Sequence, residues 1–377
     1  MIINEEYTLV DNDKSLKKLL SVLNDFEMAA IDTEADSMHH YGSKLCLIQL
    51  TVGNSNWLLD PLASLDITPV FKTKAMQILL LHGGDYDLRL LFQKYGYAPK
   101  IIFDTMLAAR LLGKKHLGLS DLVQEYFDIH LEKANQKADW TIRPLAPDMA
   151  DYALHDTVYL HELAALLGEE LNEKKRFLWH SEMCLQLIAH ASKKTLPKEE
   201  PWRITGSHHL PAKSLNLLKA VYEWREAEAK KTDRPSYKVL PPHLMLAVVR
   251  VLSATFPEID LKKLPRLPRN FVGERLDSFM EALKMAVENP VENWPKTEPR
   301  AIPPSIVPNP DLLAALKIWR DNKALELNLE PSVLANRTQL ISLALPHFDS
   351  WQKRFEDACF MNFQCEIWNA ILKENIV

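Results

Sequence analysis

The chain changes its secondary-structure pattern near residue 195, and this change limits the folds that it can adopt. Before that point, β-rich segments alternate with amphipathic segments of helical periodicity. Beyond it, a stretch rich in proline and polar residues is followed by helical patterns that prolines interrupt. This order predicts an α/β domain followed by all-α modules.

Periodicity divides the α/β part further. Short connections between the early strands predict antiparallel pairing at that end of the sheet, and Asp104 is predicted to cap the helix that follows it. Strands are predicted at residues 28–36, 44–52, 56–62, 76–84 and 100–104, and helices at 15–26, 85–96, 105–113, 119–127 and 149–177.

The helical part contains a weak internal repeat. Residues 217–245 resemble residues 312–340 when Trp224 is aligned with Trp319. In both copies an aromatic-Arg-acid triplet on an amphipathic helix is followed by a proline and a second apolar helix. The alternative is two unrelated helical bundles that share a tryptophan.

Composition narrows the class of protein. The chain is 47% hydrophobic and 25% charged, and neither a secretory leader nor a membrane-spanning helix of roughly 18 apolar residues is predicted. Its four cysteines form no CxxC pair, so a reducing cytoplasm is the predicted compartment. Residues 1–199 are acidic overall, whereas residues 200–300 carry 17 basic and 13 acidic residues. That distribution suits a carboxylate-rich site joined to a phosphate-attracting arm.

Four acids and one tyrosine are the candidates for chemistry. Asp32 and Glu34 are two apart in a predicted strand and therefore share a face, as do Tyr152 and Asp156, four apart in a predicted helix. Asp87 follows the end of another strand, and strand ends meet at one edge of an α/β sheet. Clustered carboxylates repel one another, and a pair of divalent cations is the usual remedy.

Each candidate also has a purely structural explanation. Asp87 and the neighbouring Asp85 could favour the dipole of the helix that they begin, Tyr152 could be a core aromatic, and Asp156 a solvated helix acid. Asp32 and Glu34 are harder to explain in this way, because unpaired carboxylates are costly inside an apolar strand. No phosphate-binding loop, nucleophile elbow or HExxH motif is present, and the pairs His39-His40 and His208-His209 are not predicted to be ligands.

Three segments resemble the exonuclease motifs of the DEDD superfamily, in its tyrosine-bearing subgroup: IDTEAD, HGGDYDLRLL and YALHD. The segments SKLCLIQL, LLDPL, FDTMLAARLLG and ADWTIRPL are also similar to those of the ribonuclease D family, and the helical repeats resemble the HRDC domains of that family and of RecQ-type helicases. A histidine-type enzyme would carry His at position 151, which is Asp here, whereas Tyr152 matches the tyrosine type. His155, next to Asp156, is not the matching histidine.

The resemblance implies a ribonuclease-H-like α/β exonuclease domain (residues 1–195, a mixed sheet flanked by helices) and two all-α HRDC bundles (residues 208–290 and a divergent 306–377). It implies 3′–5′ release of nucleoside 5′-monophosphates from RNA with two divalent cations, Mg²⁺ or Mn²⁺. Asp32 would bridge both ions, Glu34 and Asp156 would hold the ion on the nucleophile side, and Asp87 the other. Glu34 would also contact the terminal ribose, and Tyr152 would position the attacking water. Asp36 and Asp85 are extra acids near these motifs.

The implied partner is RNA with a single-stranded 3′ end, and transfer-RNA precursors are among the implied substrates. The enzyme is expected to be a monomer and not to bind a membrane. Phosphates are expected to bind exposed basic side chains, although these could equally be solvated helix ends; the candidates are Lys230, Lys231, Lys262, Lys263, Arg266 and Arg269. Two other functions stay open: a DNA 3′–5′ exonuclease, because the same carboxylates cut either polymer, and a non-catalytic RNA-binding scaffold on the same fold.

Overall fold

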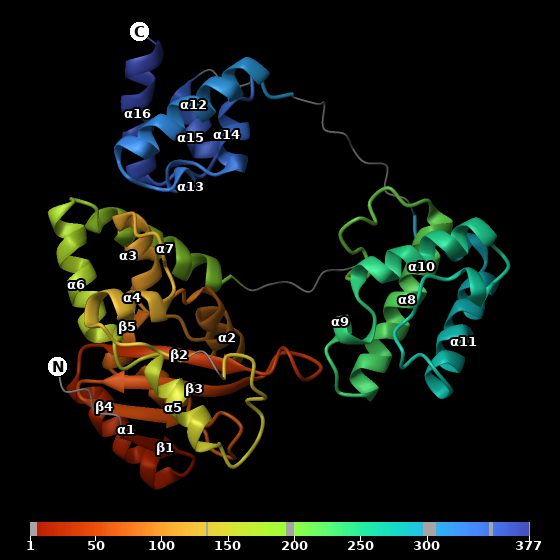
Figure 1. Cartoon of the computed structure of the whole chain (residues 1–377), viewed down its shortest axis with the longest axis horizontal. Helices are drawn as coiled ribbons and strands as arrows, with labels where there is room; N and C mark the ends of the chain where they lie inside the picture. Colours follow the sequence, from red (N-terminus) through yellow and green to blue (C-terminus); the bar gives the residue numbers. More distant parts are fainter. Residues whose placement is uncertain (1–5, 133–134, 194–199, 297–306, 347–349, 377) are drawn as a thin grey trace. The chain divides into compact units, whose positions relative to one another are not determined.

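The computed structural model describes residues 6–132, 135–193, 200–296, 307–346 and 350–376. These form two compact units, drawn in Figure 1. The first contains the described parts of Met1–Ala35, Leu45–Lys194 and Pro303–Val377, and the second those of Asp36–Lys44 and Thr195–Ile302. The predicted break near residue 195 lies partly outside the described residues.

The first unit is built on a six-stranded mixed sheet with the order β1-β4-β3-β2-β5-β6. The β2–β3 and β3–β4 pairs are antiparallel, as predicted from their short connections, and the other neighbours are parallel. The prediction missed β1, which has only four residues and one fully buried side chain, and so offers little periodicity. The strands are β1 (Tyr7–Val10), β2 (Ala29–Ala35), β3 (Leu45–Val52), β4 (Ser55–Leu59), β5 (Ile78–Leu81) and β6 (Ile101–Asp104).

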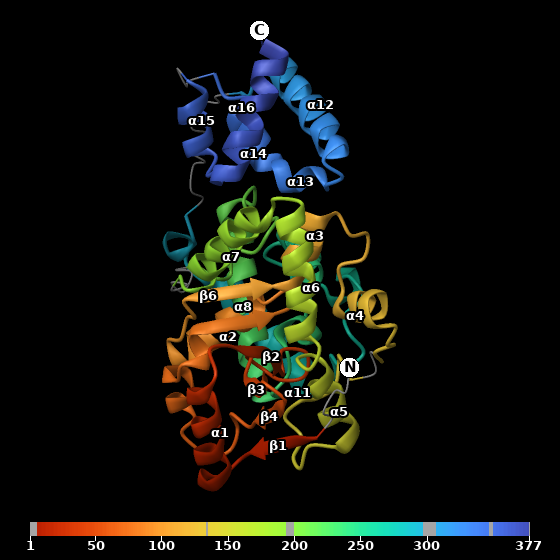
Figure 2. The ribbon, with the colours of Figure 1, turned by 90° about the vertical axis from the view of Figure 1, so that its left-hand side faces the viewer.

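Helices cover both faces of this sheet. Side chains of α1, α2 and α7 share a core with Ile31 and its neighbours on one face, whereas α5 and α6 pack against the other face near Leu58 and Ala30. Figure 2 shows α1 and α2 on one side of the strands and α5 and α6 on the other. The helices are α1 (Asp13–Asp25), α2 (Asp85–Tyr95), α3 (Thr105–Leu112), α4 (Leu119–Phe127), α5 (Pro147–His155), α6 (Leu160–Glu173) and α7 (Phe177–Ala191), with 3₁₀ turns η1 (Thr68–Lys72) and η2 (Ala75–Gln77).

The single helix predicted at residues 149–177 is wrong, because α5 ends at His155 and α6 begins at Leu160. The hydroxyl of buried Thr157 lies 2.8 Å from that of Thr51 on β3. Its side chain therefore bonds to the sheet, and a β-branched residue that bonds elsewhere is a weak helix former. This contact ties the turn after α5 to the sheet.

The later residues are helical, as predicted, and within the described residues after 200 no strand occurs. The second unit packs α10 and α11 against α8 around Trp224. Residues from 307 onward share a hydrophobic core with α3 and α6 of the first unit. The elements are α8 (Ala212–Lys231), α9 (Ser236–Val239), α10 (Pro242–Thr255), η3 (Leu261–Lys263), α11 (Glu274–Glu288), η4 (Val291–Asn293), α12 (Pro310–Glu326), α13 (Pro331–Leu334), α14 (Arg337–Leu343), α15 (Trp351–Asp357) and α16 (Asn362–Ile376). In the described part of the chain, every helix is too short or too polar to cross a membrane.

Candidate active site

The five predicted residues Asp32, Glu34, Asp87, Tyr152 and Asp156 line one cavity of about 420 Å³ in the first unit. They come from β2, the first turn of α2, and the end of α5. The structure thus brings together side chains that are up to 124 positions apart in the sequence. No lysine or arginine is among the described residues that line this cavity.

Strand alternation places Asp32 and Glu34 on the same face of β2, opposite to Ile31 and Thr33. Burial raises the pKa of Asp32 well above its usual range, and repulsion from Asp87 and Asp156 raises it further. Burial, followed by the same two repulsions, raises the pKa of Glu34 to about 9. Without a cation, the Glu34 carboxyl group therefore holds its proton near neutral pH.

Asp87 and Asp156 complete the acidic lining. The Thr33 hydroxyl donates a hydrogen bond of 2.5 Å to the Asp87 carboxylate, and Asp87 lies on the first turn of α2. Burial raises the pKa of Asp87 despite this bond. Burial and repulsion from Asp87 raise the pKa of Asp156, the C-cap of α5, to about 7.

The carboxylates suit a hard divalent cation. One oxygen from each of Asp32, Glu34 and Asp156 lies within 4.8 Å of the other two, close enough to share one ion. Asp87 lines the same cavity but does not belong to this group. Partly buried acids that repel one another are stabilised when a cation with oxygen ligands joins them.

Tyr152 is half-buried, and its ring lies 6.0 Å from that of buried Trp140. Burial, and then repulsion from Asp156 and Glu34, keeps the pKa of Tyr152 above the ordinary value near 10. The phenol is thus neutral at physiological pH, and it can donate or accept a hydrogen bond without acting as a base.

Asp36, Asp85 and His155 lie near these motifs in the sequence but make other contacts. Asp36 is buried and accepts a hydrogen bond of 2.6 Å from the backbone N–H of Lys44. Asp85 forms an ion pair of 2.6 Å with Arg89 on α2. His155 stacks on Tyr159 and lies outside the cavity lining.

The six predicted phosphate-binding residues are all exposed and all lie in the second unit. Lys230 and Lys231 end α8, and Lys231 pairs with Glu274 at 3.3 Å. Lys262 and Lys263 belong to η3, and Arg266 and Arg269 follow it. The structure does not join them to the carboxylates, which lie in the other unit.

Sequence reasoning missed several residues of the cavity. These residues come from the loop before α2, the first turn of α2, the start of α4 and the segment before α5, and among them only His82 and Tyr86 lie within a quoted motif, HGGDYDLRLL. For His82, the available signal was a polar side chain that directly follows the apolar run of β5. They are His82, Tyr86, Ser120, Leu131, Glu132 and Gln136.

Comparisons with known proteins show the family and the fold of the chain. A family described as 3′–5′ exonuclease matches residues 7–172, and the HRDC domain matches residues 214–283. Ribonuclease D of Zymomonas mobilis is 30% identical over 305 residues, which cover 78% of this chain and 77% of that protein. The chain belongs to the ribonuclease D family. Ribonuclease D of Pseudomonas paraeruginosa is 29% identical over 317 residues, 83% of each chain.

Membership of the ribonuclease D family, together with the exonuclease match, makes this chain a hydrolytic 3′–5′ exoribonuclease. Its fold is also that of the crystal structure of Escherichia coli RNase D, with a TM-score of 0.69 at 24% identity, covering 98% of this chain and 99% of that one. The predicted ribonuclease-H-like exonuclease fold and one HRDC domain are thereby confirmed. Exonucleases of this fold generally use divalent metal ions, and an acidic cluster is present among the described residues of this chain.

Proposed function

We propose that this member of the ribonuclease D family releases nucleoside 5′-monophosphates from single-stranded RNA 3′ ends with Asp32, Glu34, Asp87, Asp156 and Tyr152. The observation that carries the proposal is their meeting in one cavity, among whose described lining residues there is no lysine or arginine. A catalytic group must reach the reacting phosphate directly, and such a cavity gives all five side chains the same access.

The carboxylates would hold two divalent cations, Mg²⁺ or Mn²⁺. Asp32 would contribute to both ions, Glu34 and Asp156 to the ion on the nucleophile side, and Asp87 to the other. When bound, such ions lower the pKa of water and neutralise charge on attacking and leaving oxygens. Asp87, fixed by Thr33, would keep its carboxylate ready for its ion.

Tyr152 and Glu34 would orient the reactants. A neutral phenol in the last turn of α5 would hold the attacking water by a hydrogen bond, and this role supports the proposal that the chain is of the tyrosine-bearing subgroup. Glu34 would in addition accept a hydrogen bond from the terminal ribose. A 2′-hydroxyl contact of this kind is what separates RNA from DNA as substrate.

The remaining residues would hold the substrate. Lys230, Lys231, Lys262, Lys263, Arg266 and Arg269 are exposed and would attract phosphates of the RNA. Residues 306–377 would form a second, divergent HRDC-like module, beside a first at 208–290 and the exonuclease domain at 1–195. In support, α12, α13 and α14 repeat the order of a long helix, a four-residue helix after a proline, and a further helix seen in α8, α9 and α10. We also propose that transfer-RNA precursors are among the substrates. The enzyme would act in the cytoplasm as a monomer.

A nuclease assay tests this function. Purified protein is incubated with Mg²⁺ or Mn²⁺ and with RNA or DNA of matched sequence that carries a 3′ tail. We expect RNA to shorten from its 3′ end to 5′-monophosphates, and the activity to disappear with EDTA and in Asp32→Ala. Equal or faster degradation of DNA would favour a DNA exonuclease, and two intact substrates would favour a non-catalytic scaffold.

A further inference from the structure

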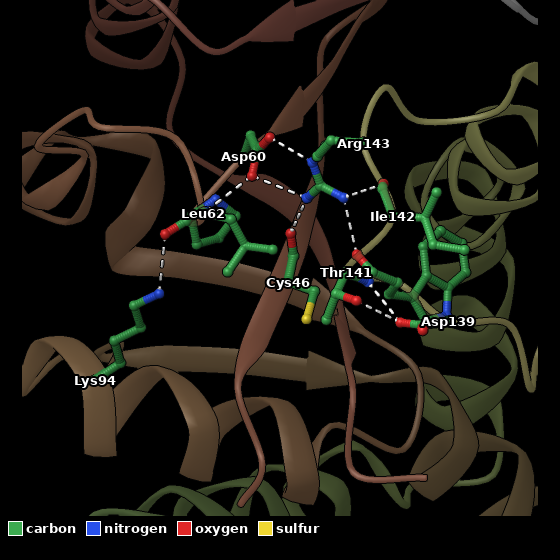
Figure 3. A network of polar contacts seen from close by, with 10 residues as sticks. Cys46, Asp60, Leu62, Lys94, Asp139, Thr141, Ile142 and Arg143 are labelled. Atoms are coloured by element: carbon green, nitrogen blue, oxygen red, sulfur yellow. Dashed lines mark hydrogen bonds and ion pairs between the residues drawn. The ribbon is translucent and has the colours of Figure 1, made fainter. Parts of the chain in front are cut away.

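One arginine outside the cavity joins three separate segments of the exonuclease domain. Arg143 lies in the segment before α5, and its guanidinium makes five hydrogen bonds, shown in Figure 3. Two go to the carboxylate of Asp60, at 2.6 and 2.9 Å. The others go to the carbonyl oxygens of Cys46, Trp140 and Ile142, at 2.8 to 2.9 Å. All five N–H donors of the side chain are therefore used.

The acceptors lie in or next to two paired strands and in the segment before α5. Cys46 is on β3, and buried Asp60 directly follows β4. Trp140 and Ile142 belong to the segment that leads into α5. The guanidinium thus fastens this segment to the sheet. A lysine, with three donors on one nitrogen, has no planar fork with which to copy the arrangement.

The fastened segment supports Tyr152. The Trp140 indole is 1% exposed and packs with Leu58, Met149 and Ala153, and Tyr152 lies against this cluster. The Trp140 and Tyr152 rings are 6.0 Å apart and inclined by 40°. The carbonyl of Trp140 is one of the acceptors of Arg143, so the arginine fixes the backbone of the residue on which the tyrosine ring rests.

The opposite end of α5 has its own anchor. Thr157, next to Asp156, bonds to Thr51 on β3 at 2.8 Å. Asp32 and Glu34 are held by the pairing of β2 with β3. Loosening the segment before α5 should therefore move Tyr152 more than it moves the carboxylates.

We propose that the Arg143–Asp60 pair is a positioning device that sets Tyr152 for the reaction. This inference rests on the role of Tyr152 given under the proposed function. Misplacing a reacting group by about 1 Å can cost on the order of 100-fold in rate. We expect Arg143→Lys to lower kcat about 10-fold and Arg143→Ala to lower it by up to about 100-fold. KM and the metal concentration for half-maximal activity should change little.

A double-mutant cycle with Tyr152→Phe tests the coupling. If Arg143 acts through Tyr152, Arg143→Lys should lower kcat in the native background and have almost no effect in the Tyr152→Phe background. Asp60→Asn should behave like Arg143→Lys. Arg89→Lys is the matched control, because Arg89 makes a surface ion pair with Asp85 that a lysine can replace, and it should leave kcat unchanged.

The outcomes separate this inference from the function on which it depends. All measurements are made well below the melting temperature of each variant, so that loss of folded protein does not count as loss of kcat. Equal fold-losses for Arg143→Lys in both backgrounds would overturn the positioning role and leave the role of Tyr152 intact. A Tyr152→Phe enzyme with native kcat would instead refute the role of Tyr152, while Asp32→Ala still reports on the metal site.

Discussion

The Thr33 hydroxyl donates a hydrogen bond of 2.5 Å to the carboxylate of Asp87, which lies 54 positions later in the chain. Thr33 is buried on the face of β2 opposite to Asp32 and Glu34. The strand that carries two of the acids therefore also orients a third, which belongs to α2. Strand β2 thus positions three of the four carboxylates.

Replacing Thr33 should weaken the metal site. In Thr33→Val the shape is nearly kept but the hydroxyl is lost, so the Asp87 carboxylate is free to rotate. Residues that orient metal ligands contribute roughly 10- to 100-fold to affinity or activity, and we expect a loss of that size at limiting Mg²⁺. Activity is measured against Mg²⁺ concentration, with Thr33→Ser as the control that keeps the hydroxyl. Native metal dependence in Thr33→Val would contradict the role.

Removing one acid should stabilise the metal-free protein at high pH. The pKa of Asp156 is about 7 in the folded chain and about 4 when unfolded, so ionisation destabilises the fold as pH rises from about 4 through about 7. Asp156→Asn should therefore increase the free energy of unfolding in EDTA by about 1–3 kcal/mol at pH 8 and by almost nothing near pH 4.

Thermal melts at both pH values, with and without Mg²⁺, check this expectation. The native protein should gain melting temperature when Mg²⁺ is added at pH 8, because the ion offsets the repulsion. Asp156→Asn should lose most of that gain. A variant that is less stable than the native protein in EDTA at pH 8 would show that the cluster is not strained by its charge.

Asp104 should be among the acids most important for stability in this domain. It is fully buried, and its carboxylate accepts hydrogen bonds from the backbone N–H groups of Gly83, Gly84, Met106 and Leu107, at 2.9 to 3.1 Å. We expect Asp104→Ala to cost about 2–4 kcal/mol in urea unfolding, because it leaves buried donors without an acceptor. Asn12→Ala, which removes the exposed N-cap of α1, should cost about 1 kcal/mol. Equal costs would refute this ranking.

The basic residues of η3 can be tested by salt dependence. If Lys262 and Lys263 contact phosphates, replacing both with alanine should weaken RNA binding and reduce the slope of log affinity against log salt by about 1–2. Metal binding should stay unchanged. Replacing Lys14 and Lys17, exposed on α1, controls for the change in net charge. Unchanged binding across the salt range would leave these lysines as solvated surface groups.

Local sequence determined much of the fold. Alternation along β2 placed Asp32 and Glu34 on one face, and the position of Asp104 before an apolar helix predicted the cap that the structure contains. Short connections predicted the antiparallel strands, and proline-punctuated periodicity predicted the later helices. These features depend on neighbours within a few residues, so the pattern of side chains is enough to reveal them.

Tertiary structure decided what depends on partners far along the chain. Only the folded sheet reveals that β1 pairs with β4, that Thr157 bonds to Thr51 and ends the predicted long helix, and that Arg143 joins Asp60 to the segment before α5. The sequence shows which residue types are present, but burial and repulsion set the pKa values of the carboxyl groups. Both effects arise only when distant segments pack together.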